Sequence, residues 1–177
     1  MSRFDCYPGF GDSDGGWAIA PGLAPERFES NAIDPTHRGD WNVWTFEATG
    51  LTLCEHAASE MMLTLDHGPL GMAPLYNHGH ADALSVFISY KNLPYFTDPG
   101  TYRYNGVPQY REYFRGTAGH NTVTVDGRDQ SQQLTGFVWA TDFEVSLEKL
   151  EVDNDVVKVC AYHCGYTSSM ERMVHRR

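Results

Sequence analysis

Apolar and polar residues alternate in short runs along most of the chain, and turn-forming residues separate these runs. In the clearest run, every second residue from Leu84 to Tyr90 is apolar or aromatic, as expected of a strand with one buried face. Lys91-Asn92 then turns the chain and 93–97 returns. This stretch therefore predicts a β-hairpin.

The same reasoning predicts further strands at 17–20, 41–46, 60–65, 121–125, 136–140, 144–152 and 156–162. Asp126-Gly127 and Asp153-Asn154-Asp155 mark tight turns between strands. A short helix over 54–62 stays open, but no long amphipathic helix appears in the pattern. The sequence thus predicts an all-β fold, an antiparallel β-sandwich, and the residues 170–177 begin another strand.

Composition divides the chain into two parts. Residues 1–40 are rich in glycine and proline and predict a loop-rich lead-in, whereas residues 41–177 carry the sandwich domain. A chain of 177 residues with 41% hydrophobic content suits one globular core. No apolar run approaches the roughly 20 residues of a membrane span. The four cysteines are too scattered for a disulfide scaffold, which leaves the compartment open.

The formal net charge of -10 argues against nucleic acid or another polyanion as a partner. The window 76–128 differs from the rest, because it holds five cations against four anions. An acidic body with a locally neutral-to-basic site can still bind an acidic ligand, particularly when a metal adds positive charge.

The run His78-Gly79-His80-Ala81-Asp82 concentrates chemically capable side chains, and three interpretations of it compete. The first takes the histidines as surface residues in a glycine-softened loop. The second is a metal-dependent hydrolase of the metallo-β-lactamase type, although Ala83 stands where that ligand run has a fourth member. The third is a cupin, although Leu84 and Ser85 stand where a cupin has its glutamate. On an extended chain, both histidines and Asp82 would face one side of a strand.

A longer part of the sequence distinguishes between these interpretations. The blocks His78 to Ser85, Asp98 to Tyr102, Phe114-Arg115 and His120 to Gly127, in this order and spacing, resemble the signature of the heparinase II/III-like family of polysaccharide lyases. The resemblance covers roughly 68–139, and 163–166 with 175–177 looks like its continuation. It implies a fragment of a larger super-sandwich, truncated at the C-terminus and lacking the α-helical toroid domain that precedes the sandwich in the family.

By this resemblance, His80, Asp98 and His120 match the metal positions of zinc-containing members, and two imidazoles with one carboxylate form a ligand set that zinc accepts. The catalytic candidates are His78, Tyr102 and Arg115. His78 matches a histidine that faces the substrate. The other two supply the aromatic face and the guanidinium group that sugar rings and carboxylates require, although aromatic residues in a sandwich are more often core.

Strand geometry and the resemblance disagree about Asp98. If Lys91-Asn92 is a two-residue turn, antiparallel pairing sets Asp98 opposite Ser85, on the other face from His80. Either the hairpin is longer or bulged near Pro94, or Asp98 only precedes Pro-Gly in a turn. Asp82 is a candidate for a place behind the ligands, where it would fix the tautomer of a histidine, an arrangement that metal sites commonly use.

Lyases of this kind cleave the bond beside a uronic acid by β-elimination. The site must neutralise the sugar carboxylate, supply a base for the C5 proton and supply an acid for the leaving oxygen. The implied substrate is an acidic polysaccharide such as alginate or a glycosaminoglycan. Because the family's catalytic tyrosine comes from the toroid, this chain alone is expected to bind zinc but to show little lyase activity.

Two rivals stay open beside the lyase. One is a non-catalytic, metal-stabilised carbohydrate-binding sandwich, in which His80 and His120 hold strands together, and the other is the metal-dependent hydrolase. The expected partners are the polysaccharide and the toroid domain of the same protein, and a homodimer is compatible with both. A periplasmic or secreted location is favoured for such a lyase.

Overall fold

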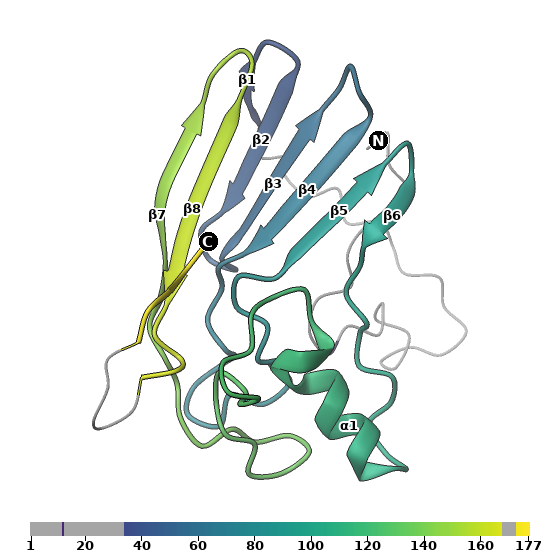
Figure 1. The fold of residues 1–177 in the computed structure, drawn as a ribbon, viewed down its shortest axis with the longest axis vertical. Helices are drawn as coiled ribbons and strands as arrows, with labels where there is room; N and C mark the ends of the chain where they lie inside the picture. The colour runs from purple at the N-terminus through teal and green to yellow at the C-terminus, as the bar shows by residue number, and fades with distance from the viewer. Residues whose placement is uncertain (1–11, 13–33, 168–172) are drawn as a thin grey trace.

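The computed structural model describes residue 12 and residues 34–167 and 173–177. Their strands form two antiparallel sheets (Figure 1). The larger sheet contains, in chain order, β1 (Thr36–Arg38), β2 (Trp41–Phe46), β3 (Leu51–His56), β4 (Met61–Asp66), β5 (Val86–Tyr90) and β6 (Leu93–Phe96). The smaller sheet contains β7 (Val145–Val152), β8 (Val157–His163) and β9 (His175–Arg176). Each strand pairs with its neighbour in sequence within its sheet.

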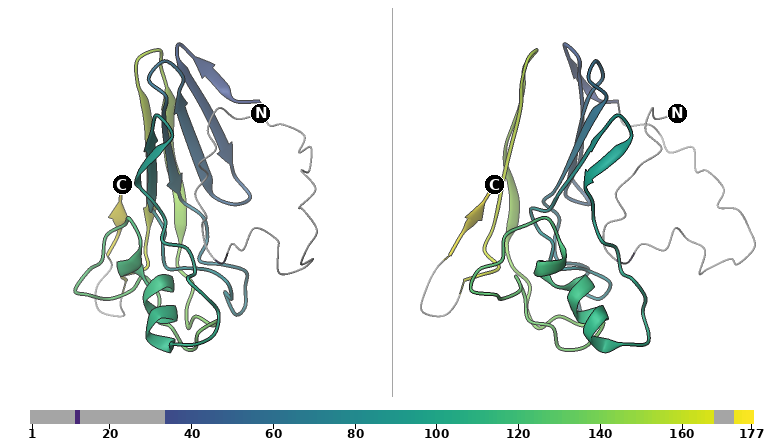
Figure 2. Two further views of the ribbon diagram at one scale, coloured as in Figure 1. Left: turned by 90° about the vertical axis from the view of Figure 1, so that its right-hand side faces the viewer. Right: turned by 45° about the vertical axis from the view of Figure 1, so that its right-hand side comes forward.

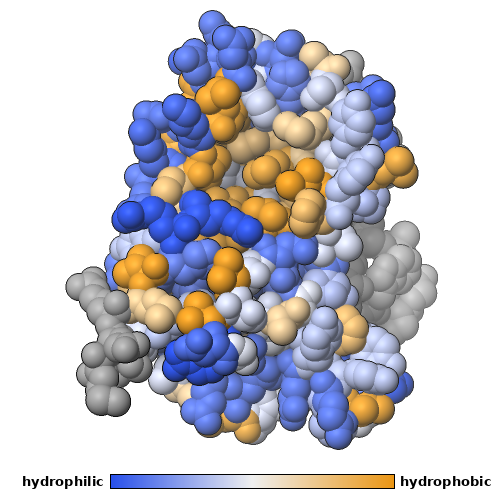
Figure 3. Space-filling view, viewed as in Figure 1, coloured by the Kyte–Doolittle hydropathy of each residue, from blue (hydrophilic) through white to orange (hydrophobic). Residues whose placement is uncertain are grey.

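The smaller sheet stands against one face of the larger one (Figure 2). Leu65, Leu84 and Ala161 form the buried centre of the contact between the sheets. Half-buried side chains of β4, β5, β7 and β8 surround this centre: Leu63, Val86, Val145, Leu147 and Val159. Apolar side chains gather in the middle of the face shown in Figure 3. Burial of the apolar side chains between the two sheets, centred on Leu65, Leu84 and Ala161, holds the sheets together.

Long connections and one helix gather at one end of the sheets (Figure 1). The helix α1 (Pro108–Arg115) begins with a proline, whose missing N–H costs nothing in the first turn, and a 3₁₀ turn (Thr117–Gly119) follows it. This end carries the connection from β4 to β5, which contains the histidine run. In the described part of the chain, no helix has the length and apolar character to cross a membrane.

The all-β sandwich predicted from the pattern is confirmed. The strands expected at 41–46, 60–65, 84–90, 93–97, 144–152 and 156–162 are present, with ends that shift by at most two residues. The turn at Asp126-Gly127 is also present, because both residues have positive φ and an isolated bridge joins Val125 to Arg128.

The other predicted elements are absent or fall wholly or partly outside the described residues. The helix considered over 54–62 is wrong, because Cys54 to His56 end β3 and Met61 starts β4 after a tight turn. The strands expected at 121–125 and 136–140 are wrong too, since these stretches are irregular and make only isolated bridges. The strand expected at 17–20 lies outside the described residues, and of 170–177 only β9 is a described strand.

A bulge in the β5–β6 hairpin explains the conflict over Asp98. Tyr90 pairs with Leu93 and Ser89 with Pro94, but Ile88 pairs with Phe96, so one extra residue lies in β6. The bulge shifts the register by one residue and the chain then leaves the sheet. Asp98 is therefore not bound to the face that a regular hairpin would give it.

His163, at the end of β8, is fully buried and holds its place through both ring nitrogens. Its Nδ1 accepts the N–H of Gly165 at 3.0 Å, so its proton lies on Nε2, 3.0 Å from His175 Nδ1. A second proton on Nδ1 would face another N–H group. Burial, with a smaller contribution from the charge of His175, lowers the pKa of His163 to about 4.

His163 should therefore make stability depend on pH. Between pH 6.5 and about 4, the unfolded chain takes a proton on His163 that the folded chain refuses, so stability falls as pH falls, by at most about 3 kcal/mol. Replacing the imidazole in His163→Gln should remove this part of the dependence. Urea unfolding of both proteins at pH 7, 5.5 and 4.5 measures it, and equal slopes against pH would contradict the assignment.

Candidate metal centre

Gly79 fixes the path of the histidine run. A Cβ on this residue would lie 1.5 Å from the carbonyl oxygen of Leu70, so only glycine fits here. The Gly79 carbonyl accepts hydrogen bonds from Nε and Nη2 of Arg115, at 3.3 Å each, and from the Trp139 indole at 3.0 Å. The peptide at Gly79 is therefore firmly held, and His78 and His80 flank it on its two sides.

The next residues of the run are held just as firmly. The backbone N–H of Ala81 donates to Arg115 O, and the side-chain amide of Gln130 bonds both the N–H and the carbonyl of Ala83. Asp82 lies between these two anchored residues and is buried. The run is not a strand, so the expectation that its side chains share one strand face is wrong.

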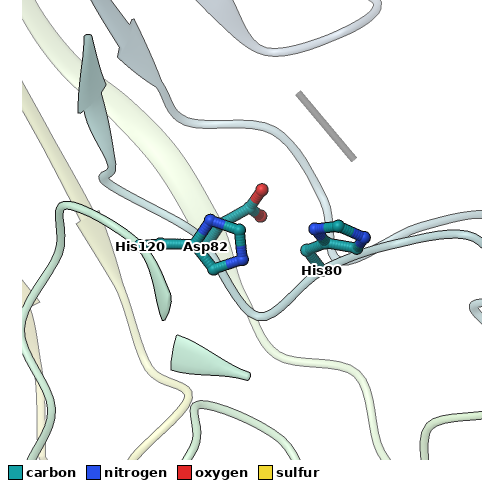
Figure 4. A group of neighbouring side chains, drawn as sticks. All are labelled: His80, Asp82 and His120. Carbon is teal, nitrogen blue, oxygen red and sulfur yellow. The ribbon is translucent and has the colours of Figure 1, made fainter. Parts of the chain in front are cut away.

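His80, Asp82 and His120 form a compact group in which one potential ligand atom of each residue lies within 4.8 Å of the others (Figure 4). All three residues are buried. His80 Nδ1 and His120 Nε2 are also buried and have no hydrogen-bond partner among the residues that the structure describes. Buried polar atoms are nearly always paired, so two unpaired imidazole nitrogens beside a carboxylate have the chemistry of a cation site.

A carboxylate accepts a hydrogen bond from the opposite nitrogen of each of these imidazoles. His120 Nδ1 lies 2.9 Å from Asp98 Oδ2, and His80 Nε2 lies 3.0 Å from Asp12 Oδ1. Each carboxylate draws the proton of its histidine to the side away from the group and leaves the other nitrogen as a free electron pair. Asp98 also accepts the N–H of Gly100 at 2.8 Å, so it serves the Pro-Gly turn as well.

Several buried carboxyl groups lie close together at this site, and their charges favour binding of a proton or a cation. Burial raises the pKa of Asp66 to about 7, and the charge of Asp98 adds to the rise although the Gly68 N–H opposes it. Burial, with the charges of Asp66 and Asp98, also raises the pKa of Asp82 well above its ordinary value. Near neutral pH this group of carboxyl groups must either keep protons or bind a cation.

An open pocket of about 320 Å³ reaches the group from solvent. Its lining includes Asp66, Asn77, His78, His80 and Asp82. The His78 side chain is 58% exposed, and its Nδ1 lies 3.0 Å from Asp12 Oδ2. His78 is therefore the imidazole that an incoming molecule meets first.

The three catalytic candidates occupy different environments. His78 lies at the pocket. Tyr102 is 53% exposed, stacks on Phe114 at 5.4 Å between ring centres and carries Arg103 above its ring. Arg115 is fully buried, with its guanidinium on the carbonyls of Gly79 and Thr135 and over the Trp139 ring. Arg115 thus holds the loop, and its burial leaves it no surface for a substrate.

Sequence reasoning did not find Asp12 or Asp66. Asp12 lies 66 residues before His78 in a stretch rich in glycine and proline, and no spacing relates it to the histidine run. Asp66 ends β4, where an aspartate before a turn is ordinary. Only their burial beside other carboxyl groups and imidazoles marks them as part of the site.

The fold and the site together define a two-sheet β-sandwich with a buried imidazole–carboxylate group beneath a pocket. A family model described as heparinase II/III-like, C-terminal, matches residues 38–177, and the chain belongs to this family of polysaccharide lyases. No curated protein and no solved structure matches the chain.

Replacing Gly79 by alanine should disrupt the site. The added Cβ would overlap the Leu70 carbonyl, so the run must shift and the hydrogen bonds from Arg115 and Trp139 must lengthen. We expect Gly79→Ala to lose more than about 2 kcal/mol of unfolding free energy, measured by urea denaturation.

Gly127→Ala is the matched control, because a Cβ there meets nothing within 4 Å and only the positive φ opposes it. It should cost about 1 kcal/mol. Equal losses in the two variants would show that the close approach of Gly79 to Leu70 does not determine the path of the loop.

Proposed function

We propose that this chain is the metal-bearing β-sandwich part of a lyase that cleaves a uronic-acid-containing polysaccharide, of the alginate or glycosaminoglycan type, by β-elimination. The observation that carries the proposal is the pair of buried, unpaired nitrogens on His80 and His120 beside the Asp82 carboxylate. Membership of a polysaccharide lyase family supports the reaction class.

We propose zinc as the cation, held by His80 Nδ1, His120 Nε2 and a carboxylate oxygen of Asp82. Two imidazoles and one carboxylate are a usual ligand set of catalytic zinc, which keeps one position open. Bound there, the ion would supply the positive charge that offsets the buried carboxylates and attracts the carboxylate of a uronic acid.

This assignment exchanges two roles expected from the sequence, in which Asp98 is the ligand by resemblance and Asp82 lies behind the ligands. Its support is geometric: Asp98 Oδ2 lies 2.9 Å from His120 Nδ1 and Asp98 Oδ1 accepts from Gly100, whereas Asp82 groups with both histidines. In the proposed arrangement, Asp98 orients His120 and fixes its tautomer.

His78 is the group of this chain that we propose to exchange a proton with the substrate. Its ring is exposed at the pocket and its Nδ1 is engaged by Asp12, which leaves Nε2 for the sugar. The rings of Tyr104 and Phe137 lie edge-on to it, at 6.2 and 6.1 Å between centres, and limit its rotation. We propose that an α-helical toroid domain supplies the tyrosine that completes the acid–base set.

A non-catalytic, metal-stabilised carbohydrate-binding sandwich is the second candidate. One observation favours it: the His80 and His120 side chains have no exposed surface, as expected of an ion that holds loops together. A metal-dependent hydrolase would differ from both in giving products with saturated ends.

The metal proposal predicts one zinc ion per chain. His120→Gln should weaken binding more than about 100-fold because it removes a ligand, and Asp82→Asn should weaken it more than Asp98→Asn, for which a loss of about 10- to 100-fold is typical of an orienting residue. Titration calorimetry with zinc chloride measures the affinities. His56→Gln, at the end of β3, is the control and should bind as the unaltered protein does.

A larger loss of zinc affinity in Asp98→Asn than in Asp82→Asn would show that Asp98, and not Asp82, is the ligand. Absence of zinc binding by the unaltered chain would refute the metal site itself.

The lyase proposal predicts that this chain alone releases almost no unsaturated uronic ends from alginate or glycosaminoglycans, and that the protein joined to its toroid releases them readily. Absorbance near the ultraviolet maximum of these ends measures both reactions. Strong release of unsaturated ends by the chain alone would contradict the proposal that the acid–base residues are divided between this chain and the toroid. Release of saturated ends would favour the hydrolase.

A further inference from the structure

Asp12 is bound to the site from outside the stretch that matches the family, which begins at residue 38. Its carboxylate is 1% exposed, and two guanidinium nitrogens of Arg111 donate to it at 2.6 and 2.7 Å. His78 Nδ1 and His80 Nε2 each lie 3.0 Å from it, and the Thr101 hydroxyl donates to it as well. The carboxylate therefore has a position built by several separate parts of the sandwich.

Arg111 is also held in place by contacts other than its ion pair with Asp12. Its Nε donates to Gly136 O at 2.9 Å, and its guanidinium lies over the rings of Tyr104 and Phe137, at 5.3 and 5.2 Å. The backbone of Asp12 is also bound, since its N–H donates to His78 O and its carbonyl accepts the Tyr104 hydroxyl. A fixed guanidinium and a fixed backbone leave the carboxylate little freedom to turn away from His80.

The carboxylate stays ionised in this position. Two guanidinium nitrogens of Arg111 donate to its two oxygens, and such a bidentate ion pair favours the charged form of the carboxylate. An ionised carboxylate is an acceptor only, so it requires a proton on His80 Nε2. His80 Nδ1, which is buried and unpaired, must then carry the free electron pair.

We propose that Asp12 is a positioning residue of the metal centre, which fixes the Nε2–H tautomer of His80 and directs its Nδ1 at the bound ion. Asp98 plays the matching part for His120, so a carboxylate stands behind each imidazole. The inference rests on the proposed metal site. It assigns Asp12 a part in that site, and the family match does not include this residue.

The test compares zinc affinity and histidine tautomer in full-length variants. Asp12→Ala should bind zinc about 10- to 100-fold more weakly, and Asp12→Asn, which keeps an acceptor oxygen, should lose less. Long-range proton–nitrogen NMR of the metal-free proteins should show His80 as the Nε2–H tautomer in the unaltered chain and as a mixture in Asp12→Ala. Added formate, which can enter the space left beside Arg111, should restore part of the affinity.

Asp126→Ala is the matched control, because Asp126 also pairs with an arginine but its side chain is 78% exposed. It should change neither affinity nor tautomer. Asp12→Ala leaves Arg111 buried without its partner, so a variant that fails to fold is replaced by Asp12→Ala/Arg111→Met, which has no unpaired buried charge.

A folded variant with unaltered zinc affinity and an unaltered His80 tautomer would overturn the inference and leave Asp12 as a counter-ion of Arg111 alone. That result differs from failure of the metal site, in which the unaltered chain would bind no zinc either.

Discussion

The site depends on one close approach, that of the Gly79 peptide to the chain at Leu70. Because no side chain fits there, the Gly79 backbone can pack directly against the Leu70 carbonyl. The Gly79 carbonyl then accepts hydrogen bonds from Arg115 and Trp139. One histidine is thereby left outside, at the pocket, and the other inside, beside Asp82. This constraint separates His78 and His80 into a surface group and a buried group, although only one residue lies between them.

Much of the fold followed from local pattern. The β5–β6 and β7–β8 hairpins were predictable because alternating residues flank short polar turns, and a turn fixes the pairing of the strands that it joins. The strands expected at 121–125 and 136–140 failed because β-branched and aromatic residues suit any extended, half-buried chain. Whether a sheet edge is free to pair with such a stretch is decided by distant parts of the molecule, and here side chains such as Thr122 and Gln130 bind the backbone of the neighbouring loop instead.

The site was predictable only where its residues repeat at short spacing or match the family. His78, His80 and His120 were found in this way, and the structure brings the last two together. Asp98 is close to His120 because of a one-residue bulge, which no alternation in the sequence reveals. Asp12 and Asp66 take part through burial and charge, and those depend on how remote segments pack.

The bulge in β6 has a further consequence for the molecule's behaviour in solution. β6 is an edge of the larger sheet as described, and Leu93, Tyr95 and Phe96 on it are exposed. Such an edge would ordinarily invite pairing with another chain. Here Pro94 lacks an N–H and the extra residue interrupts the regular spacing of donors and acceptors along β6. The irregularity that places Asp98 beside His120 therefore also makes this edge a poor template for another strand.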